Sequence, residues 1–349
     1  YDSQRDVYMA MIDDLDAAME TLYTFASAGD GILMRDFDIS SFKGDSRLWV
    51  SFANTLKLRM AIRMSGVEPE ARRIAEEAVR DMATYGLIDA NAENLSFSSD
   101  SRQNPFYTQA TSTSWQDLRS NASIVMYMNA YEDPRRASYF SKSGYDGIYV
   151  GVRAGIQNVT PTDYATYSYP LFAEKDPVPV MYASESWFLR AEGALLGWTM
   201  GDTAENLYNT GVKTSLELWG NGSSYETYIA SETAPALSYA DPRNKHNVSD
   251  FGTAVSVKWA DDGNELVRII TQKWIANHMI GHEAWADVRR TGYPRLLQVV
   301  NNLSGGMWGN VDSSKGMRRL HYPQSEYDNN RENVLRGVEL LGGSDLHGT

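Results

Sequence analysis

The chain has 349 residues and a formal net charge of −13, from 45 acidic and 32 basic side chains. Because nucleic acids attract a basic face, this charge argues against a nucleic-acid-binding protein. Hydrophobic residues make up 42% of the chain and charged residues 22%, as in an ordered globular protein. Cysteine is absent, which excludes disulfides, thiolate catalysis, iron–sulfur clusters and Cys-based zinc sites. No apolar run in the sequence approaches the roughly 20 residues of a membrane-spanning helix.

Three amphipathic helices are expected in the first quarter of the chain. In each of them apolar residues recur every three or four positions, which places them on one helical face. Asp45 or Ser46 offers a side-chain oxygen as N-cap of the second helix, and Gly86 stands where a left-handed C-cap ends the third. The three expected helices cover residues 5–22, 49–64 and 69–82.

The helical period weakens over residues 95–182, where Ser, Thr, Asn, Gly and Tyr are frequent, apart from a helix expected at 118–131. It returns at 184–198 and 204–219, two segments joined by a short Gly-Asp turn, which we expect to pair antiparallel. One further helix is expected at 265–290, followed by loops and short turns. Helix pairs of this length predict an all-α fold of the tetratricopeptide type, and the long loops between them are the place to look for function.

His278 and His282 are four residues apart on the last expected helix, with Glu283 beside them, which is ligand spacing for a divalent metal. The His-Glu-x-x-His order of metalloproteases fails because Ala286 stands at its last position. We therefore expect no metal and no cofactor. The sequence also lacks the G-x-S-x-G, Walker A and G-x-G-x-x-G motifs. A carboxylate pair for glycoside hydrolysis stays open, because spatial separation rather than sequence spacing defines it.

The segment 95–182 concentrates aromatic rings beside planar polar groups. Rings stack on the C–H faces of sugars while Asn, Asp and Arg hydrogen-bond the hydroxyls, and a similar surface can hold a peptide. The alternative is that the tyrosines fix a long loop to the helices, each hydroxyl finding a buried partner. We expect the ligand-binding side chains among Trp115, Tyr145, Tyr149, Tyr164, Tyr167, Tyr169, Arg153, Asn158 and Asp163, with Trp115 the first choice because it stands among small polar residues.

The run Gly-His-Glu-Ala-Trp-Ala-Asp-Val-Arg-Arg-Thr-Gly-Tyr-Pro at 281–294 is the most specific motif of the chain. Together with the segments 49–63, 184–192, 272–276 and 318–326, in that order, it resembles the SusD/RagB family, the surface lipoproteins of Bacteroidetes nutrient-uptake systems. We interpret the run as a mark of the fold rather than a ligand site. Its rings and those just before it, Trp274, Trp285 and Tyr293, have the spacing of core residues, and Arg289 and Arg290 are expected to bond Glu283 or helix C-terminal carbonyls.

The resemblance implies a single domain built as an α-α superhelix with a long irregular insertion. Its expected parts are helical repeats at 1–94, a loop-rich ligand-binding region at 95–182, further helical repeats at 183–295 and a C-terminal strap at 296–349. Family members begin with a lipoprotein signal, a lipidated Cys and a first helical repeat, which this sequence does not contain. We therefore expect the natural protein to extend beyond Tyr1.

The resemblance also implies a function. It predicts a non-catalytic protein on the extracellular face of the outer membrane, held there only by an N-terminal lipid anchor. Its partners would be an oligosaccharide or polysaccharide and a SusC-like TonB-dependent transporter that receives the glycan. A peptide receptor of the same fold and a glycoside hydrolase in an all-α scaffold are the alternatives.

Overall fold

The computed structural model describes residues 1–99, 103–111, 118–306 and 309–346. It is mostly helical, with 48% of the residues in helices and 7% in strands. The all-α class expected from the sequence is therefore confirmed, with a helix content above the globular average of about a third. No helix in the described part of the chain is long and apolar enough to cross a membrane.

The helices of the first half are α1 (Gln4–Ala28), α2 (Ser46–Met64), α3 (Ala71–Arg80), α4 (Met82–Tyr85), α5 (Pro105–Thr111), α6 (Ala122–Ala130) and α7 (Arg136–Tyr139). Those of the second half are α8 (Ala183–Leu195), α9 (Ala204–Leu218), α10 (Tyr225–Ile229), α11 (Glu265–Ala276), α12 (Gly281–Thr291), α13 (Gln324–Asn329) and α14 (Arg331–Leu340). Short 3-10 turns occur at Asn91–Glu93, Pro161–Tyr164 and Gly222–Ser224. Strands β1 (Leu95–Phe97) and β2 (Val178–Met181) pair antiparallel, as do β3 (Ala236–Tyr239) and β4 (Val248–Thr253).

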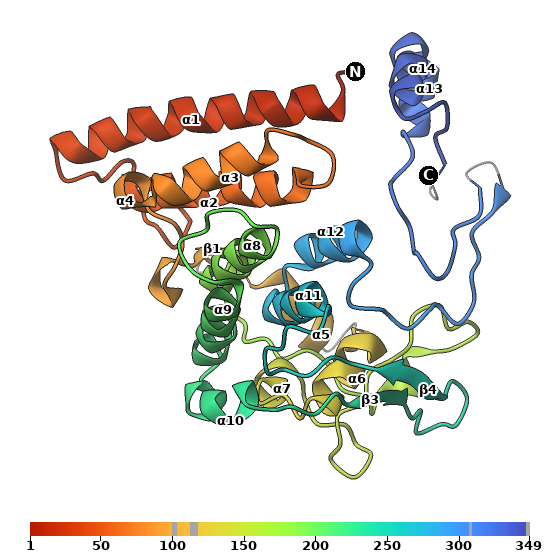
Figure 1. Ribbon diagram of the computed structural model, residues 1–349. Coiled ribbons are helices and arrows are strands. Elements are labelled where there is room, and N and C mark those ends of the chain that lie inside the picture. The colour runs from red at the N-terminus through yellow and green to blue at the C-terminus, as the bar shows by residue number, and fades with distance from the viewer. Residues whose placement is uncertain (100–102, 112–117, 307–308, 347–349) are drawn as a thin grey trace.

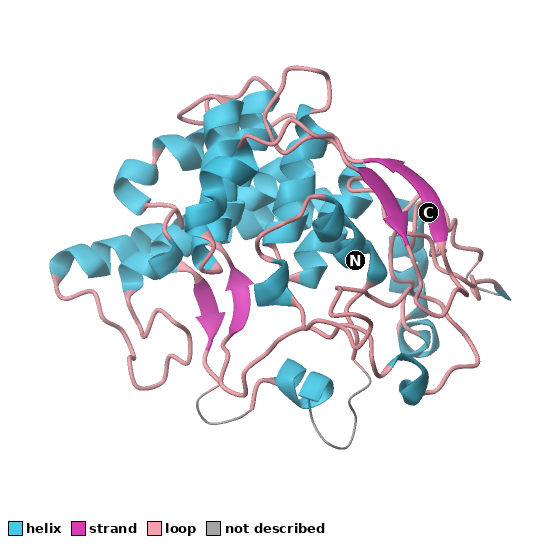
Figure 2. Cartoon of the chain, turned by 90° about the horizontal axis from the view of Figure 1, so that it is seen from below, coloured by secondary structure: helices cyan, strands magenta, loops and turns pink. Residues whose placement is uncertain are grey.

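The helices stack side by side and the loops gather at one end. Helices α1, α2 and α3 form one end of the molecule, α8 and α9 make the expected antiparallel pair, and α11 lies against α8 (Figure 1). Helices α6 and α7 and the β3–β4 pair gather at the opposite end (Figure 1), and the two strand pairs lie at the periphery of the helices (Figure 2). The tetratricopeptide-like arrangement of helix pairs therefore carries a loop-rich end, as predicted.

The helix ends follow local chemistry at the two positions singled out in the sequence. The Asp45 carboxylate caps α2 by accepting hydrogen bonds from the backbone N–H groups of Arg47 and Leu48. The third predicted helix is split at Asp81 into α3 and α4, and Gly86 ends it with a φ of 76°, a conformation that favours glycine. The N-cap prediction is confirmed; Gly86 is the C-cap as predicted, but its ψ of 173° places it outside the left-handed helical conformation expected there.

Two expectations for the second half are wrong. The single helix expected at 265–290 is broken between α11 and α12, where Met279 takes a φ of 71° and a new helix begins at Gly281. The apolar spacing continues through this break, so periodicity did not reveal it. The C-terminal region expected to hold only loops and short turns contains α13 and α14, whose buried residues are so few that no apolar stripe marks them.

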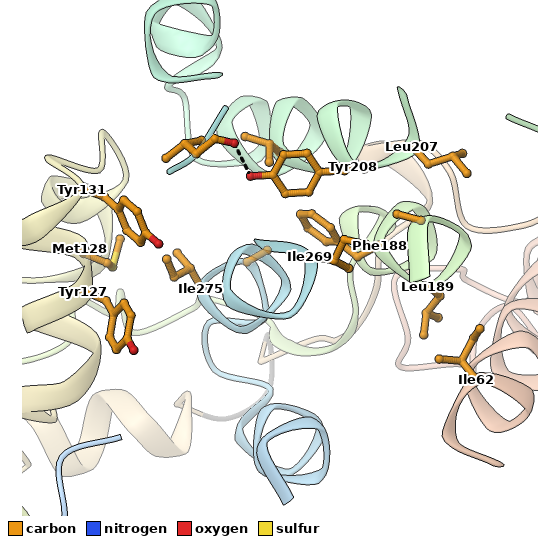
Figure 3. Packing of buried hydrophobic residues seen from close by; sticks show 14 of the residues in the cluster. Ile62, Tyr127, Met128, Tyr131, Phe188, Leu189, Leu207, Tyr208, Ile269 and Ile275 are labelled. Atoms are coloured by element: carbon orange, nitrogen blue, oxygen red, sulfur yellow. Dashed lines mark hydrogen bonds between the residues drawn. The ribbon is translucent and has the colours of Figure 1, made fainter. Parts of the chain in front are cut away.

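One hydrophobic core joins helices from both halves of the chain. Ile62 of α2 lies beside Leu189 of α8, while Phe188 of α8 faces Tyr208 of α9 and Ile269 of α11 (Figure 3). All belong to one cluster, which α6 closes on the other side. The Tyr208 hydroxyl donates to the Val257 carbonyl at 2.7 Å, so the polar end of this buried ring has a partner. The core therefore spans the molecule from the first helices to the loop-rich end.

A buried ion-pair network crosses this core. It consists of Arg59, Glu185, Lys273, Glu283 and Asp287, which come from α2, α8, α11 and α12. Arg59 donates two hydrogen bonds to Glu185, at 2.8 and 2.7 Å, and lies 3.5 Å from Glu283, while Lys273 lies 2.9 Å from Asp287. Four of the sequence segments that resemble the family thus meet at one place. Because each buried charge needs an opposite charge from another helix, the network fixes how these helices sit together.

The signature at 281–294 is only partly a core motif. Trp274, just before it, packs against Tyr127 with ring centroids 5.8 Å apart, as expected. Trp285 is 40% exposed, and the Arg289 guanidinium lies over its ring at 4.8 Å, so its predicted place in the core is wrong. Arg290 pairs with Glu192 and Asp287 rather than with Glu283, whose partners are Arg59 and Arg63.

Candidate functional site

Two of the predicted tyrosines are buried where the loop-rich region meets the β3–β4 pair. The Tyr167 hydroxyl donates to the Asp241 carboxylate, and its ring packs edge-on against Tyr145 and Tyr164, with centroids 5.6 and 4.8 Å away. Burial raises the pKa of Tyr167, and the hydrogen bond to the carboxylate raises it further. Tyr164 and Tyr167 are too buried to stack on a ligand, so their role in this structure is to hold the loop in place.

Asp241 is the acceptor on which this part of the loop is organised. Its carboxylate accepts from the backbone N–H groups of Arg243, Lys245 and His246 as well as from Tyr167. Burial alone would raise the pKa of Asp241, but these hydrogen bonds stabilise the charged form and the pKa is lowered overall. Asp241 therefore stays ionised.

Asp163 also serves the loop itself. It accepts from the backbone N–H and hydroxyl of Thr160 at 2.7 and 2.9 Å, and Arg243 lies 2.7 Å away. These hydrogen bonds, with the Arg243 charge, lower the pKa of Asp163 to about 2. The Arg243 guanidinium also lies 5.1 Å from the centre of the Tyr164 ring, so it joins this carboxylate to the buried tyrosines.

The other two predicted polar residues differ in how far they are anchored. Arg153 donates to the carbonyls of His246 and Gln298, at 3.4 and 2.6 Å, and thereby ties the loop to two later segments. Asn158 is exposed with a φ of 55°, a conformation that Asn adopts more readily than most residues. Of the pair, only Asn158 is exposed.

Tyr145, Tyr149 and Tyr169 are half-buried and keep part of each ring accessible. The Arg136 guanidinium lies 5.8 Å from the Tyr149 ring centre, while the backbone of Tyr169 exchanges hydrogen bonds with Ser141. Trp115, the first choice from the sequence, lies outside the described residues. The structure thus brings Tyr145, Tyr164 and Tyr167 into one cluster, with Asp163 joined to it through Arg243.

A cavity of about 580 Å³ lies beside this region, and the sequence did not point to it. Trp259 lines it with its ring half-buried against Tyr208, at a centroid distance of 5.5 Å, and its indole N–H donates to Asp261. The same cavity is lined by two ion pairs, Lys258 with Glu232 at 2.6 Å and Arg268 with Asp262 at 2.7 Å. The hydrogen bond from Arg268 lowers the pKa of Asp262 and the one from Lys258 lowers the pKa of Glu232, so both pairs are charged.

An aromatic ring beside charged planar groups in a cavity of this size suits a sugar or a similar small polar ligand. The reasoning that singled out Trp115 could also have found this cavity, because Trp259 begins the polar run Trp-Ala-Asp-Asp-Gly-Asn at 259–264.

The two histidines occupy different surroundings. His278 is buried, stacked on Tyr139 with centroids 4.0 Å apart, and burial lowers its pKa to about 3. The His282 side chain is 75% exposed and lies 3.4 Å from Glu283. Within the described residues, no group of three or more His, Asp or Glu side chains is arranged to hold a metal ion.

Helix pairs of this order with a loop-rich end define a tetratricopeptide-like helical scaffold that presents loops. The family model of SusD-like proteins, described as SusD and RagB outer membrane lipoprotein, matches residues 1–349. The chain therefore belongs to the SusD-like family, whose members are described as outer membrane lipoproteins. The membership predicted from the sequence is confirmed.

Solved structures agree with this assignment. A chitin-binding SusD homologue from Flavobacterium johnsoniae is 40% identical with a TM-score of 0.91, covering 100% of this chain and 72% of that one. A SusD homologue from Bacteroides uniformis gives the same four values. One from Bacteroides thetaiotaomicron is 38% identical with a TM-score of 0.89, covering 100% of this chain and 74% of that one. No curated protein matches the sequence.

Proposed function

We propose that this protein captures glycans at the cell surface and delivers them to a SusC-like TonB-dependent transporter without chemical turnover. The observation that carries the proposal is the 40% identity, over the whole of this chain, to a chitin-binding SusD homologue. The family description as outer membrane lipoprotein supports a lipid anchor and display on the extracellular face. Chitin-type oligosaccharides are accordingly the first ligands to test.

The ligand surface is proposed on the loop-rich end, which carries half-exposed rings and an exposed polar side chain. Tyr145, Tyr149 and Tyr169 supply ring faces together with Trp115, and Asn158 supplies hydrogen-bonding groups, while Arg153 and Asp163 position the loop that carries them. Loops held by a rigid scaffold favour binding because the scaffold has already met the cost of ordering them. The cavity lined by Trp259 is the second place for a sugar ring on this side of the core.

Calorimetric titration with chito-oligosaccharides, followed by chromatography of the incubated ligand, tests both halves of the proposal. We expect saturable binding and unchanged oligosaccharide. Products of hydrolysis would favour the enzyme alternative, and binding of a peptide panel without binding of any glycan would favour the peptide receptor.

Alanine substitutions then locate the surface. A stacked ring contributes on the order of 1 kcal/mol, so Trp115→Ala, Tyr149→Ala or Trp259→Ala should weaken binding several-fold if that ring contacts the ligand. Trp285→Ala is the matched control, because it removes an exposed tryptophan from α12. Affinity that survives alanine at every one of these loop positions, in folded variants, would place the ligand elsewhere.

The transporter and the anchor have their own test. The lipidated full-length protein should co-purify with a TonB-dependent transporter from outer membranes and should be accessible to protease on intact cells. A protein found only in the cytosol would contradict this part of the proposal and leave glycan binding to be judged by titration.

A further inference from the structure

A second cavity, of about 480 Å³, lies far along the chain from the loop-rich region. It is formed where the N-terminal turn of α1, the last turn of α2, α12 and the chain around Arg318 approach one another. In Figure 1 the start of α1 lies above α12, on the side where the chain continues toward α13 and α14. We call this cavity the arginine pocket.

The arginine pocket is strongly basic in a chain whose net charge is −13. Within the described part of the chain, five of its lining residues are arginines and one, Glu68, is an acid. The arginines come from three helices and the strap: Arg5, Arg63, Arg289, Arg290 and Arg318. A concave surface lined by one sign of charge concentrates ions of the opposite sign.

Three of these arginines are already paired. Arg5 donates to Glu68 at 2.7 Å, Arg63 donates to Glu283, and Arg290 donates to Glu192 at 2.9 Å. Their positive charge is largely matched, so they shape the wall more than they attract a ligand. The Nε atoms of Arg63 and Arg290 are nevertheless buried and have no acceptor among the described residues.

Arg289 and Arg318 are different. Neither guanidinium forms an ion pair with a carboxylate in the described residues. Arg289 donates to the main-chain carbonyl of Arg318 at 2.7 Å and lies over the Trp285 ring, which uses its planar surface but leaves its charge unmatched. Arg318 is half-buried and lines the same pocket next to Arg289. These two side chains are the pocket's unmatched cations.

The shape of the guanidinium groups and the volume of the pocket indicate which kind of ligand would pair with Arg289 and Arg318. The guanidinium group is a planar fork of N–H donors that fits the two oxygens of a carboxylate or a sulfate group. The cavity is many times the roughly 30 Å³ that a water molecule occupies in the liquid, so it admits a group as large as a sugar ring. Tyr8, Met64 and Val67 provide apolar wall on the α1 and α2 side.

We propose that the arginine pocket binds an oxyanion, the carboxylate or sulfate group of a small ligand, between Arg289 and Arg318. The inference is independent of the glycan surface proposed on the loop-rich end, since no residue is shared between them. An acidic sugar and a free inorganic anion both carry this chemistry, and the experiment separates them.

Calorimetric titrations with sodium sulfate and with sodium D-glucuronate, at constant ionic strength set with sodium chloride, test the pocket. We expect at least one of the two to bind saturably. Glucuronate binding without D-glucose binding identifies the acidic sugar as a source, whereas sulfate binding alone identifies a free anion. Absence of binding by both probes would overturn the proposal.

Variants place the anion in the pocket. Arg318→Gln removes a cation but keeps the main-chain carbonyl that accepts from Arg289, so the fold is preserved. A hydrogen bond to a charged group is worth roughly tenfold in affinity, and Arg318→Gln and Arg289→Gln should each weaken binding by about that factor. Arg80→Gln, an exposed arginine on α3, removes the same charge elsewhere and should bind as wild type. Equal affinity in all three variants would overturn the site.

Discussion

The helical layers and the loop-rich end both hold carboxylates in place through several partners, but they do so in different ways. In the helices, Glu185 pairs with the side chains of Arg59 and Lys273 from two other helices. In the loops, Asp241 accepts from three backbone N–H groups and Tyr167, and Asp163 accepts from the backbone N–H and hydroxyl of Thr160 and from Arg243. A helix satisfies its own backbone, so its buried charges must be matched by side chains from neighbours, whereas a loop has free N–H groups that need acceptors.

The contrast teaches where each region is vulnerable. A charge lost from the helices leaves a buried opposite charge without a partner and disturbs several helices at once. A charge or hydroxyl lost from the loops frees a few local donors, many of which water can reach. The predictions below test this difference, beginning with the largest expected effect.

Removing one charge from the buried ion-pair network should destabilise the whole protein. Glu185→Gln leaves Arg59 and Lys273 with an uncompensated buried charge, and breaking such a pair typically costs about 3 kcal/mol or more. Urea unfolding measures the loss. Glu226→Gln, an exposed glutamate on α10, is the control and should change stability by less than about 0.5 kcal/mol. A similar loss in both variants would remove the distinction between buried and exposed charge.

Acidification should weaken the helical region through His278. Its folded pKa of about 3 is below the ordinary value of 6.5, so the unfolded chain takes up a proton first as the pH falls. The contribution of His278 to the free energy of unfolding is complete above its ordinary pKa and declines as the pH falls from about 6.5 toward 3. Between pH 7 and pH 5 the loss is about 2 kcal/mol. Urea midpoints at the two pH values measure it.

The control for this pH effect uses the second histidine. His278→Phe keeps an aromatic ring against Tyr139 and should lose the decline between pH 7 and pH 5. His282→Ala removes an exposed ring and should keep the decline. If stability declined equally in the wild type and in His278→Phe, the decline between pH 7 and pH 5 would come from carboxylates rather than from this histidine.

In the loops, Tyr167→Phe should have an intermediate effect. It deletes the hydroxyl that donates to Asp241 while keeping the ring that packs on Tyr145 and Tyr164. Because three backbone donors remain on the carboxylate, we expect a loss of about 1–2 kcal/mol, less than for Glu185→Gln. Tyr169→Phe, at a half-buried ring, should cost less than about 0.5 kcal/mol. A loss for Tyr167→Phe equal to that for Glu185→Gln would abolish the proposed contrast.

The smallest effect is expected at Asp163. Its folded pKa of about 2 is below the ordinary value of 3.8, so its contribution is present above pH 4 and is lost as the pH falls from about 4 to about 2. The difference in thermal midpoint between wild type and Asp163→Asn should therefore be present at pH 6 and shrink at pH 3. A difference in thermal midpoint that grew on acidification would mean that folding raises the pKa of Asp163 instead of lowering it.

The sequence predicted the helices best where an apolar stripe and a cap coincide, as in α2 with Asp45 and in the α8–α9 pair. It failed where the apolar spacing continued past the end of a helix. Met279 has a positive φ there, and an apolar side chain gives no indication of that conformation in the sequence. Helices α13 and α14 escaped notice because Val334 and Gly337 are the buried residues of that region, too few for a period to be seen.

The candidate site was harder to predict than the fold. A tyrosine in a loop carries no periodic signal, so Tyr145 and Tyr149, which keep ring surface exposed, could not be told from Tyr164 and Tyr167, which are buried. Their difference arises from Asp241, which is some seventy residues away from Tyr167 along the chain and supplies its acceptor. Burial decided by a distant segment is a property of the tertiary structure and not of the local sequence.

The buried ion-pair network also limits how the sequence can change. Replacing Arg59, Glu185 or Lys273 singly leaves a partner charged in the core, so the first step of any exchange is strongly unfavourable. A simultaneous replacement by apolar residues of matching volume can be neutral or even stabilising. These positions should therefore be substituted together or not at all as related chains diverge, although the helices that carry them are far apart along the sequence.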